Sequence, residues 1–229
     1  MNPLKALQDY GQSVWLDYIR RSLITSGELQ RLVDGDGLRG ITSNPAIFEK
    51  AITGSTDYAD VLKTLEGQKG MDAKSLYESL AIPDIQDAAD VLWPVYEKTN
   101  RRDGFVSLEV SPYLARDTQA TIEEARRLWR AVGRDNVMIK VPATPEGIPA
   151  IKQLIGEGIN INVTLLFSQQ AYERVVEAYI AGLERLVAQG GDPSNVASVA
   201  SFFVSRIDSA IDAIAAARLK TATSATERS

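Results

Sequence analysis

The sequence predicts an α/β protein built on a parallel sheet, and three observations support this class. Short apolar runs of strand length alternate along the chain with longer amphipathic stretches, which is the pattern of repeated strand–helix units. The predicted strands carry polar side chains on one of their two faces. The length of 229 residues suits one barrel-sized domain or two small ones, and allows a sizeable core.

The first half of the chain predicts two strands and a long helical insert. Residues 3–10 form a helix with proline in its first turn, and residues 14–18 form the first strand. Thr25 or Ser26 can cap a helix over residues 27–33, and the second strand covers residues 38–43. A helical insert follows over about residues 46–100, with breaks expected near Gly54, Gly70 and Pro83.

The second half predicts four strands that alternate with helices. The strands cover residues 105–110, 137–141, 159–166 and 196–204, and the helices that follow them cover residues 118–132, 148–155, 169–188 and 207–219. A closed barrel of this kind has eight strands. The six strands found here therefore fit an incomplete barrel, an open sheet, or a barrel completed by something else.

Composition excludes several classes of function. The net charge is −5 and there is no basic tract, so we expect no nucleic-acid partner. No apolar stretch reaches membrane-spanning length and the N-terminus lacks a signal-peptide core, so we expect no membrane partner and a cytoplasmic location. Cysteine and histidine are absent, which excludes thiolate sites, a serine–histidine triad and the usual zinc sites. Acid–base chemistry would fall to Asp, Glu, Lys, Tyr or water.

Lys140 is the most informative residue in this sequence. It lies in the apolar run over residues 137–142, which has turn signals on both sides. A charged amine in a buried strand is costly unless it is paired or loses its proton. A lysine that gives up its proton near neutral pH can attack a carbonyl carbon. The alternative is a structural ion pair with a buried carboxylate.

The polar residues of the strands fall on one face. Alternate residues of a strand share a face, so in the fifth strand Ile161, Val163 and Leu165 oppose the polar side chains. We expect the apolar faces to lie under the helices. The opposite faces carry Asp17, Asn44, Glu109, Lys140, Asn162, Thr164 and Ser201. Alone, each has a structural explanation such as a turn or a satisfied hydroxyl, but together they predict a polar pocket at the carboxyl ends of the strands.

Several segments resemble transaldolases. Residues 40–45 (Gly-Ile-Thr-Ser-Asn-Pro) look like the family's Thr-Thr/Ser-Asn-Pro signature, and residues 139–144 resemble the segment that bears its Schiff-base lysine. Residues 158–168 match the family's Gly-Ile-Asn-x-Asn-x-Thr-Leu-Leu-Phe-Ser. Residues 106–110 resemble the strand with the acid–base glutamate, and residues 201–208 the strand whose end binds phosphate. The match covers nearly the whole chain in order and is similar to the longer bacterial type.

The resemblance implies a (β/α)8 barrel of the class I aldolase group, acting in the pentose phosphate pathway. Such an enzyme transfers a dihydroxyacetone unit from sedoheptulose 7-phosphate or fructose 6-phosphate to an aldose phosphate. Its partners are sugar phosphates, and it uses no metal and no organic cofactor. The resemblance gives no oligomeric state. A lysine-dependent fructose 6-phosphate aldolase is the related alternative.

The resemblance also implies a role for each site residue. Lys140 is the Schiff-base nucleophile and Asp17 is the base for the C4 hydroxyl. Glu109 and Thr164 hold the catalytic water. The substrate-binding residues are Thr42, Asn44, Asn162, Ser201 and, for the phosphate, Arg206.

One departure from the family pattern concerns the C-terminal part. We expect a single transaldolase-like barrel domain over residues 1–229, but find no seventh or eighth strand and no second phosphate-binding arginine. Arg228 lies in a polar tail and is not equated with that arginine. Two hypotheses follow: a working transaldolase, whose barrel another chain could complete, or a truncated, non-catalytic fragment.

Overall fold

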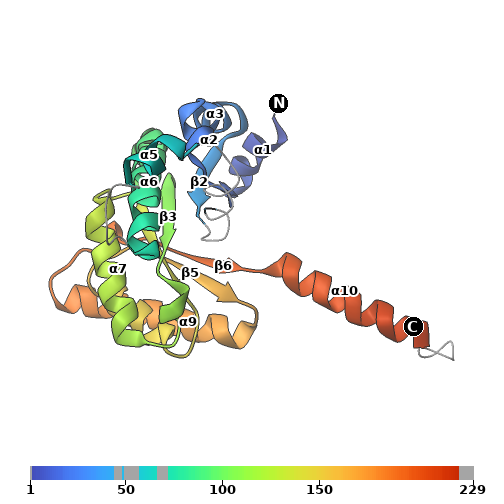
Figure 1. Ribbon diagram of the computed structural model, residues 1–229. Coiled ribbons are helices and arrows are strands. Elements are labelled where there is room, and N and C mark those ends of the chain that lie inside the picture. The colour runs from blue at the N-terminus through green and yellow to red at the C-terminus, as the bar shows by residue number, and fades with distance from the viewer. Residues whose placement is uncertain (1, 44–47, 49–56, 66–71, 222–229) are drawn as a thin grey trace.

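Six parallel strands form a single sheet in the order β1-β2-β3-β4-β5-β6, so each strand pairs with its neighbour in the sequence. The computed structural model describes residues 2–43, 48, 57–65 and 72–221. The strands are β1 (Val14–Leu16), β2 (Leu38–Thr42), β3 (Phe105–Glu109), β4 (Val137–Pro142), β5 (Ile161–Leu166) and β6 (Ser198–Phe202). All six predicted strands are confirmed. Across the described residues the sheet forms a half-barrel that is open between β6 and β1 (Figure 1).

Helices alternate with the strands, and most of them cover the outer face of the sheet (Figure 1). They are α1 (Pro3–Ala6), α2 (Arg21–Thr25), α3 (Glu28–Arg31), α5 (Ala59–Leu65), α6 (Ala73–Lys98), α7 (Thr118–Val132), α8 (Gly147–Ile155), α9 (Gln169–Ala188) and α10 (Val204–Thr221). Short turns complete the chain: η1 (Leu7–Tyr10), η2 (Leu32–Asp36), η3 (Pro112–Leu114) and η4 (Pro193–Asn195). Helices α7 and α9 have the predicted bounds, while α2 is not predicted from the sequence.

The two faces of the sheet bury different clusters, as strand alternation predicts. Val106, Ile139 and Val163 belong to the large core between the sheet and the helices. Phe105 and Met138 point to the other face, where Trp15 and Val199 pack against them. The inner face of the sheet therefore carries this small apolar cluster together with the polar side chains of the strands, which the sequence predicted to form a site.

The expectation of a helix break near Pro83 is wrong. Helix α6 runs without interruption through Pro83 and Pro94. A proline inside a helix removes a backbone hydrogen bond and costs about 3 kcal/mol. Burial offsets this, since one fully buried leucine contributes about 1.5–3 kcal/mol and α6 buries Leu80, Ala81, Ile85, Ala88, Ala89 and Leu92. The other two expected breaks, near Gly54 and Gly70, lie outside the described residues.

The placement of Leu165 on the apolar face is also wrong. Its φ of 59° is in the left-handed region, and the pairing of β5 with β6 shifts register between Val163 and Leu166. The irregularity turns Leu165 away from the core, so that the residue is 42% exposed, while Leu166 is fully buried in the core. Alternation along a strand holds only while the backbone stays extended.

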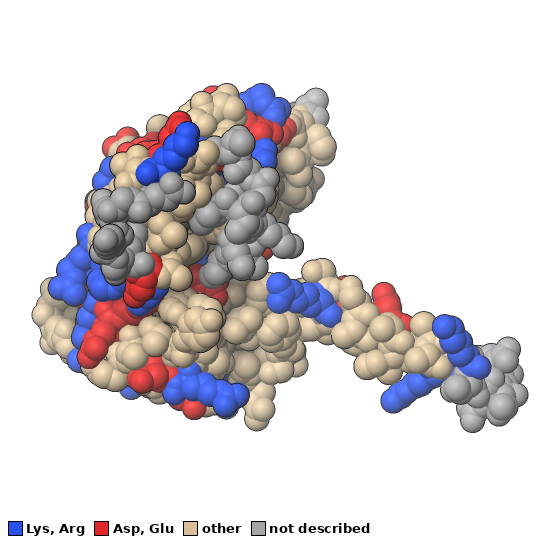
Figure 2. All heavy atoms as spheres, in the orientation of Figure 1, with Lys and Arg blue, Asp and Glu red and all other residues tan. Residues whose placement is uncertain are grey.

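Helix α10 projects from the rest of the molecule (Figure 1). Four of its large apolar residues are at least half exposed: Val204, Ile211, Ile214 and Leu219. Figure 2 shows that uncharged atoms cover much of this helix. Within the described ranges, no helix combines the length and the apolar character needed to cross a membrane.

Candidate active site

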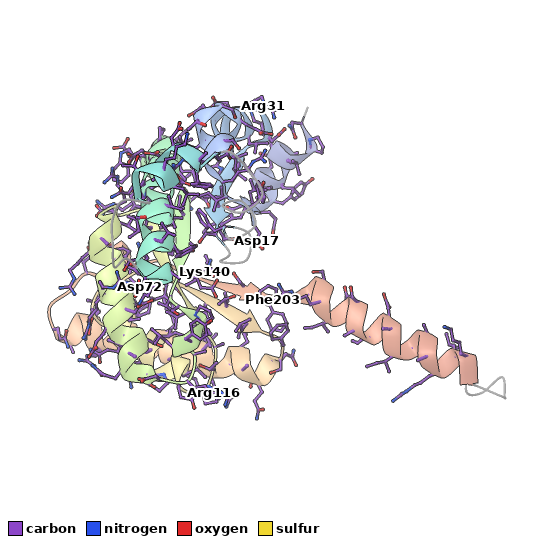
Figure 3. The ribbon with its side chains drawn as sticks, in the orientation of Figure 1. Asp17, Arg31, Asp72, Arg116, Lys140 and Phe203 are labelled. Carbon is purple, nitrogen blue, oxygen red and sulfur yellow. The ribbon has the colours of Figure 1, made fainter. Side chains whose placement is uncertain are left out.

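A groove of about 890 Å³ lies over the inner face of the sheet. Every predicted site residue except Asn44 lines it, and Asn44 lies outside the described residues. Figure 3 shows Lys140 beside the open inner side of the sheet, with Asp17 and Phe203 on either side of it. The predicted residues brought together here are Asp17, Thr42, Glu109, Lys140, Asn162, Thr164, Ser201 and Arg206.

Strand register places the lysine in the middle of a row. Glu109 of β3 pairs with Lys140 of β4, which in turn pairs with Asn162 of β5. Parallel neighbours in register point to the same face, so the three side chains lie side by side. Lys140 is 5% exposed and its Nζ is 3.6 Å from Glu109 Oε2. The same Nζ donates a hydrogen bond of 3.1 Å to the carbonyl oxygen of Ser43.

Glu109 ends β3 at the border between the protein interior and the groove. Burial raises the pKa of its carboxyl above the usual range, and the negative charge of Asp17 adds to this effect. The positive charge of Lys140 opposes it, but burial dominates. A carboxyl group with a raised pKa is suited to exchange protons with water near neutral pH.

Asp17 and Asn162 are oriented by neighbouring hydroxyl groups. Thr42 Oγ1 donates a short hydrogen bond to Asp17 Oδ1, which ties the end of β1 to the end of β2. Asn162 Nδ2 donates to Ser107 Oγ at 3.0 Å, and Asn162 Oδ1 accepts from Ser201 Oγ at 2.8 Å. These bonds link β3, β5 and β6 and fix the amide of Asn162, which is fully buried.

Arg206 reaches the groove from the first turn of α10. Its guanidinium lies 4.3 Å from the ring centre of Phe203, and that ring stacks on Phe167 at 5.2 Å. Within the part of the chain that the structure describes, Arg206 makes no ion pair, so its forked donors are available to an anion.

Several other groups at the site are absent from the predicted set. The Ser43 carbonyl holds the lysine, but a backbone atom has no signature in the sequence. Ser107 orients Asn162, and its place on the polar face of the third strand is a signal that could have found it. Trp15 and Leu165 also line the groove; strand alternation indicates the first and misplaces the second.

The curled parallel sheet, with a buried lysine on its inner face, defines a protein of the α/β-barrel class. Residues 14–228 match the family described as Transaldolase/Fructose-6-phosphate aldolase. The chain belongs to this family.

Curated relatives agree with this assignment. The chain is 54% identical over 213 residues to Transaldolase 2 of Nostoc sp. PCC 7120, covering 93% of this chain and 55% of the relative. It is 51% identical over 226 residues to Transaldolase of Trichodesmium erythraeum, covering 98% and 59%. It is 47% identical over 220 residues to Transaldolase of Neisseria gonorrhoeae, covering 96% and 62%. The chain thus spans between 55% and 62% of the length of these relatives.

Proposed function

We propose that this chain carries the site of a Schiff-base transaldolase. The donor is sedoheptulose 7-phosphate or fructose 6-phosphate, and the acceptor is an aldose phosphate. The observation that supports this proposal best is the buried Lys140 amine, set in a row between Glu109 and Asn162 on the inner face of the sheet. The reaction needs an amine, carboxylates and water, all of which the chain and solvent supply.

The first step is the addition of the lysine to the donor. Lys140 Nζ attacks the C2 carbonyl carbon and forms a carbinolamine. The C2 oxygen then leaves as water, with a proton delivered through a water molecule held by Glu109 and Thr164, and an iminium ion remains. The raised pKa of Glu109 favours this delivery, because the carboxyl keeps its proton to a higher pH than an exposed glutamate.

The second step breaks the C3–C4 bond of the donor. Asp17 takes the proton of the C4 hydroxyl, the C4 oxygen forms a carbonyl, and the electron pair of the C3–C4 bond moves into the iminium. This releases an aldose phosphate and leaves an enamine on Lys140. The enamine carbon attacks the aldehyde of the acceptor, Asp17 returns the proton, and hydrolysis of the new iminium frees the product.

The other polar side chains hold the substrate. Asn162 and Ser201 are joined by a hydrogen bond and face the groove, where they can bind the hydroxyl groups of the dihydroxyacetone unit. We assign the same role to Thr42 and Asn44. Arg206 binds the phosphate through its forked guanidinium donors.

Borohydride trapping tests the proposal directly. The chain is incubated with fructose 6-phosphate, reduced with borohydride and weighed by mass spectrometry. We expect a dihydroxyacetone-derived adduct, and its loss in Lys140→Met, where the side chain keeps its length without the amine. The matched control is Lys152→Met on α8, an exposed lysine that should leave the adduct in place. A folded chain that forms no adduct, as a non-catalytic fragment would, contradicts the proposal.

The family description also supports a second candidate, a fructose 6-phosphate aldolase-like lyase. Such an enzyme shares the steps up to the enamine. Protonation of the enamine carbon then regenerates the iminium, and water hydrolyses it to free dihydroxyacetone and the lysine amine. Product analysis with and without an aldose phosphate acceptor separates the two functions. Transfer requires the acceptor, whereas cleavage releases dihydroxyacetone in its absence.

A further inference from the structure

Two polar groups beside the groove have fewer partners than their chemistry allows. Among the described residues, the one polar contact of the Glu109 carboxyl is its 3.6 Å approach to Lys140. An ionised carboxylate can accept about four hydrogen bonds. The hydroxyl of Tyr77 is fully buried and has no hydrogen-bond partner in the described part of the chain. A buried hydroxyl without a partner is uncommon and calls for a reason.

A second cavity brings these two groups together. It has a volume of about 330 Å³, and both Tyr77 and Glu109 line it. Glu109 also lines the groove that holds Lys140, so this residue borders both spaces. Apolar side chains form much of the remaining wall, including Ile82, Leu108 and Leu128. A hydroxyl and a carboxylate interact more strongly in such surroundings than in water.

Packing fixes the ring of Tyr77. The residue lies in the second turn of α6, and its ring meets that of Phe48 edge to face, with centres 5.8 Å apart. Phe48 is fully buried. The same helix already uses one such pair elsewhere, since Tyr58 Oη donates to Asp84 Oδ2 at 2.7 Å. Tyr77 has the donor for a similar bond and no carboxylate partner in this arrangement of side chains.

The Tyr77 hydroxyl and the Glu109 carboxyl interact electrostatically. Burial, and then the negative charge of Glu109, hold the pKa of Tyr77 above its usual range, so Tyr77 stays a donor at neutral pH. Glu109 is also faced by Lys140 on β4 and Asp17 after β1. The other titratable groups around the second cavity are Lys74, Glu78, Tyr113 and Glu124; Lys74 pairs with Glu124, and Arg127 of α7 pairs with Glu78 and Glu124.

We infer that Tyr77 is a positioning residue for Glu109. Its hydroxyl donates a hydrogen bond to the ionised Glu109 carboxylate across the cavity they share, and this bond holds the carboxylate beside Lys140 when a proton must move. The inference rests on the proposed function for its place in the reaction. The bond is absent from this arrangement of side chains, in which the Tyr77 hydroxyl has no partner among the described residues, and it forms when the Glu109 carboxylate turns toward that hydroxyl. It needs no substrate, so it can be tested in the free protein.

The test follows the protonation of Glu109 in the chain without substrate. Infrared spectroscopy detects the C=O stretch of a protonated carboxyl, and Glu109→Gln identifies the band. A hydrogen bond to the charged form lowers the pKa of a carboxyl, so Tyr77→Phe should move the titration midpoint upward by about one pH unit. Phenylalanine keeps the ring against Phe48 and removes only the hydroxyl oxygen, so the fold should be retained.

Tyr113→Phe is the matched control. Tyr113 lines the same cavity but is 95% exposed, so its substitution should leave the midpoint of Glu109 in place. An unchanged midpoint in folded Tyr77→Phe overturns the inference, and so does an equal shift in both variants. Where wild-type chain forms the borohydride adduct, the pH midpoint of its formation rate should move with Glu109 in Tyr77→Phe. A chain that forms no adduct refutes the proposed function, while the titration still decides whether the bond exists.

Discussion

Lys140 and Glu109 place opposite charges in a part of the protein where water is scarce. Lys140 Nζ and Glu109 Oε2 are 3.6 Å apart, which is longer than a good charge-assisted hydrogen bond. Each charge is therefore only partly compensated by the other, and burial still raises the pKa of Glu109. Such a pair contributes little to stability, because desolvation of both ions opposes their attraction. Under the proposed function, this pair serves the reaction and not the stability of the fold.

A first prediction concerns the stability of Glu109→Gln as a function of pH. The unfolded chain has the usual glutamate pKa of about 4.3, and the folded value is higher, so ionisation favours unfolding. The contribution of this group is fully present below the unfolded pKa and is lost as the pH rises through the folded pKa. Glutamine suffers no such loss. Urea unfolding should show the free energy of unfolding of the variant rising relative to the parent from about pH 4 upward.

Glu157→Gln gives the control with the opposite sign. Arg126 lowers the pKa of Glu157, so this carboxylate contributes stability above its unfolded pKa and loses it as the pH falls. The variant should be less stable than the parent at neutral pH, and the difference should vanish in acid. A Glu109→Gln difference that behaves in the same way would contradict the sign assigned to Glu109.

At the scale of elements, a group of polar side chains joins helix α6 to helix α2. Asp84 on its inner side is 1% exposed and accepts hydrogen bonds from Tyr58 and from Arg21 of α2. The Arg21 guanidinium also lies over the Tyr58 ring, 4.6 Å from its centre. These contacts hold α2, which follows the Asp17 segment, against α6.

We expect Asp84→Ala to destabilise the chain by about 3 kcal/mol, because it leaves the partly buried guanidinium of Arg21 and the buried hydroxyl of Tyr58 without their partner. The matched control is Asp90→Ala on the same helix. Asp90 pairs with Arg134 but is 55% exposed, so its loss should cost less than about 1 kcal/mol. Chemical denaturation of both variants measures the difference. Equal losses of unfolding free energy in the two variants would show that the buried contacts of Asp84 stabilise the chain no more than the exposed ion pair of Asp90.

At the scale of the whole molecule, the half-barrel leaves one helix without a packing surface. Every residue of α10 from Val204 to Lys220 is exposed except Ile207. Isolated helices of this length are only marginally stable in water. Helix α9, in contrast, buries Val175, Ala178, Gly182 and Leu186 against its neighbours.

Hydrogen exchange should therefore separate the two helices. The amides of α10 are expected to exchange close to the rate of a fraying helix, whereas those of α9 and β4 should be protected by the cooperative fold. Mass spectrometry of peptides after timed exchange measures this directly. Equal protection of α10 and α9 would contradict the prediction and would mean that α10 is packed in solution.

Local patterns predicted most of the fold. The bounds of α7 follow from Asp117, which caps its first turn, and from Gly133, whose φ of 59° ends it. Pro83 shows where local rules fail, because the burial that keeps α6 intact depends on distant residues. Helix α2 is too short for an amphipathic repeat and is held by contacts to Tyr58 and Asp84 from the insert.

Strand alternation also predicted most of the residues of the candidate site. It predicted that Glu109, Lys140 and Asn162 share a face, and the register of three strands then puts them in one row. It could not predict Leu165, since one left-handed residue at a strand end reverses the alternation. Nor could it indicate the Ser43 carbonyl, because its position depends on how β2 ends and not on side-chain type.

Among the described residues, the two polar contacts of the Lys140 amine both come from earlier in the chain. Ser43 follows β2 and Glu109 ends β3, while Ser201 and Arg206 belong to β6 and α10. During synthesis, these two contacts of the amine can therefore form as soon as β4 has joined β2 and β3, before Asn162 of β5 takes its place beside Lys140. Substitutions in β6 or α10 change what the groove can hold and leave the placement of the amine intact. If the proposed function holds, a nascent chain acquires the contacts of its nucleophile before the residues proposed to bind the rest of the substrate.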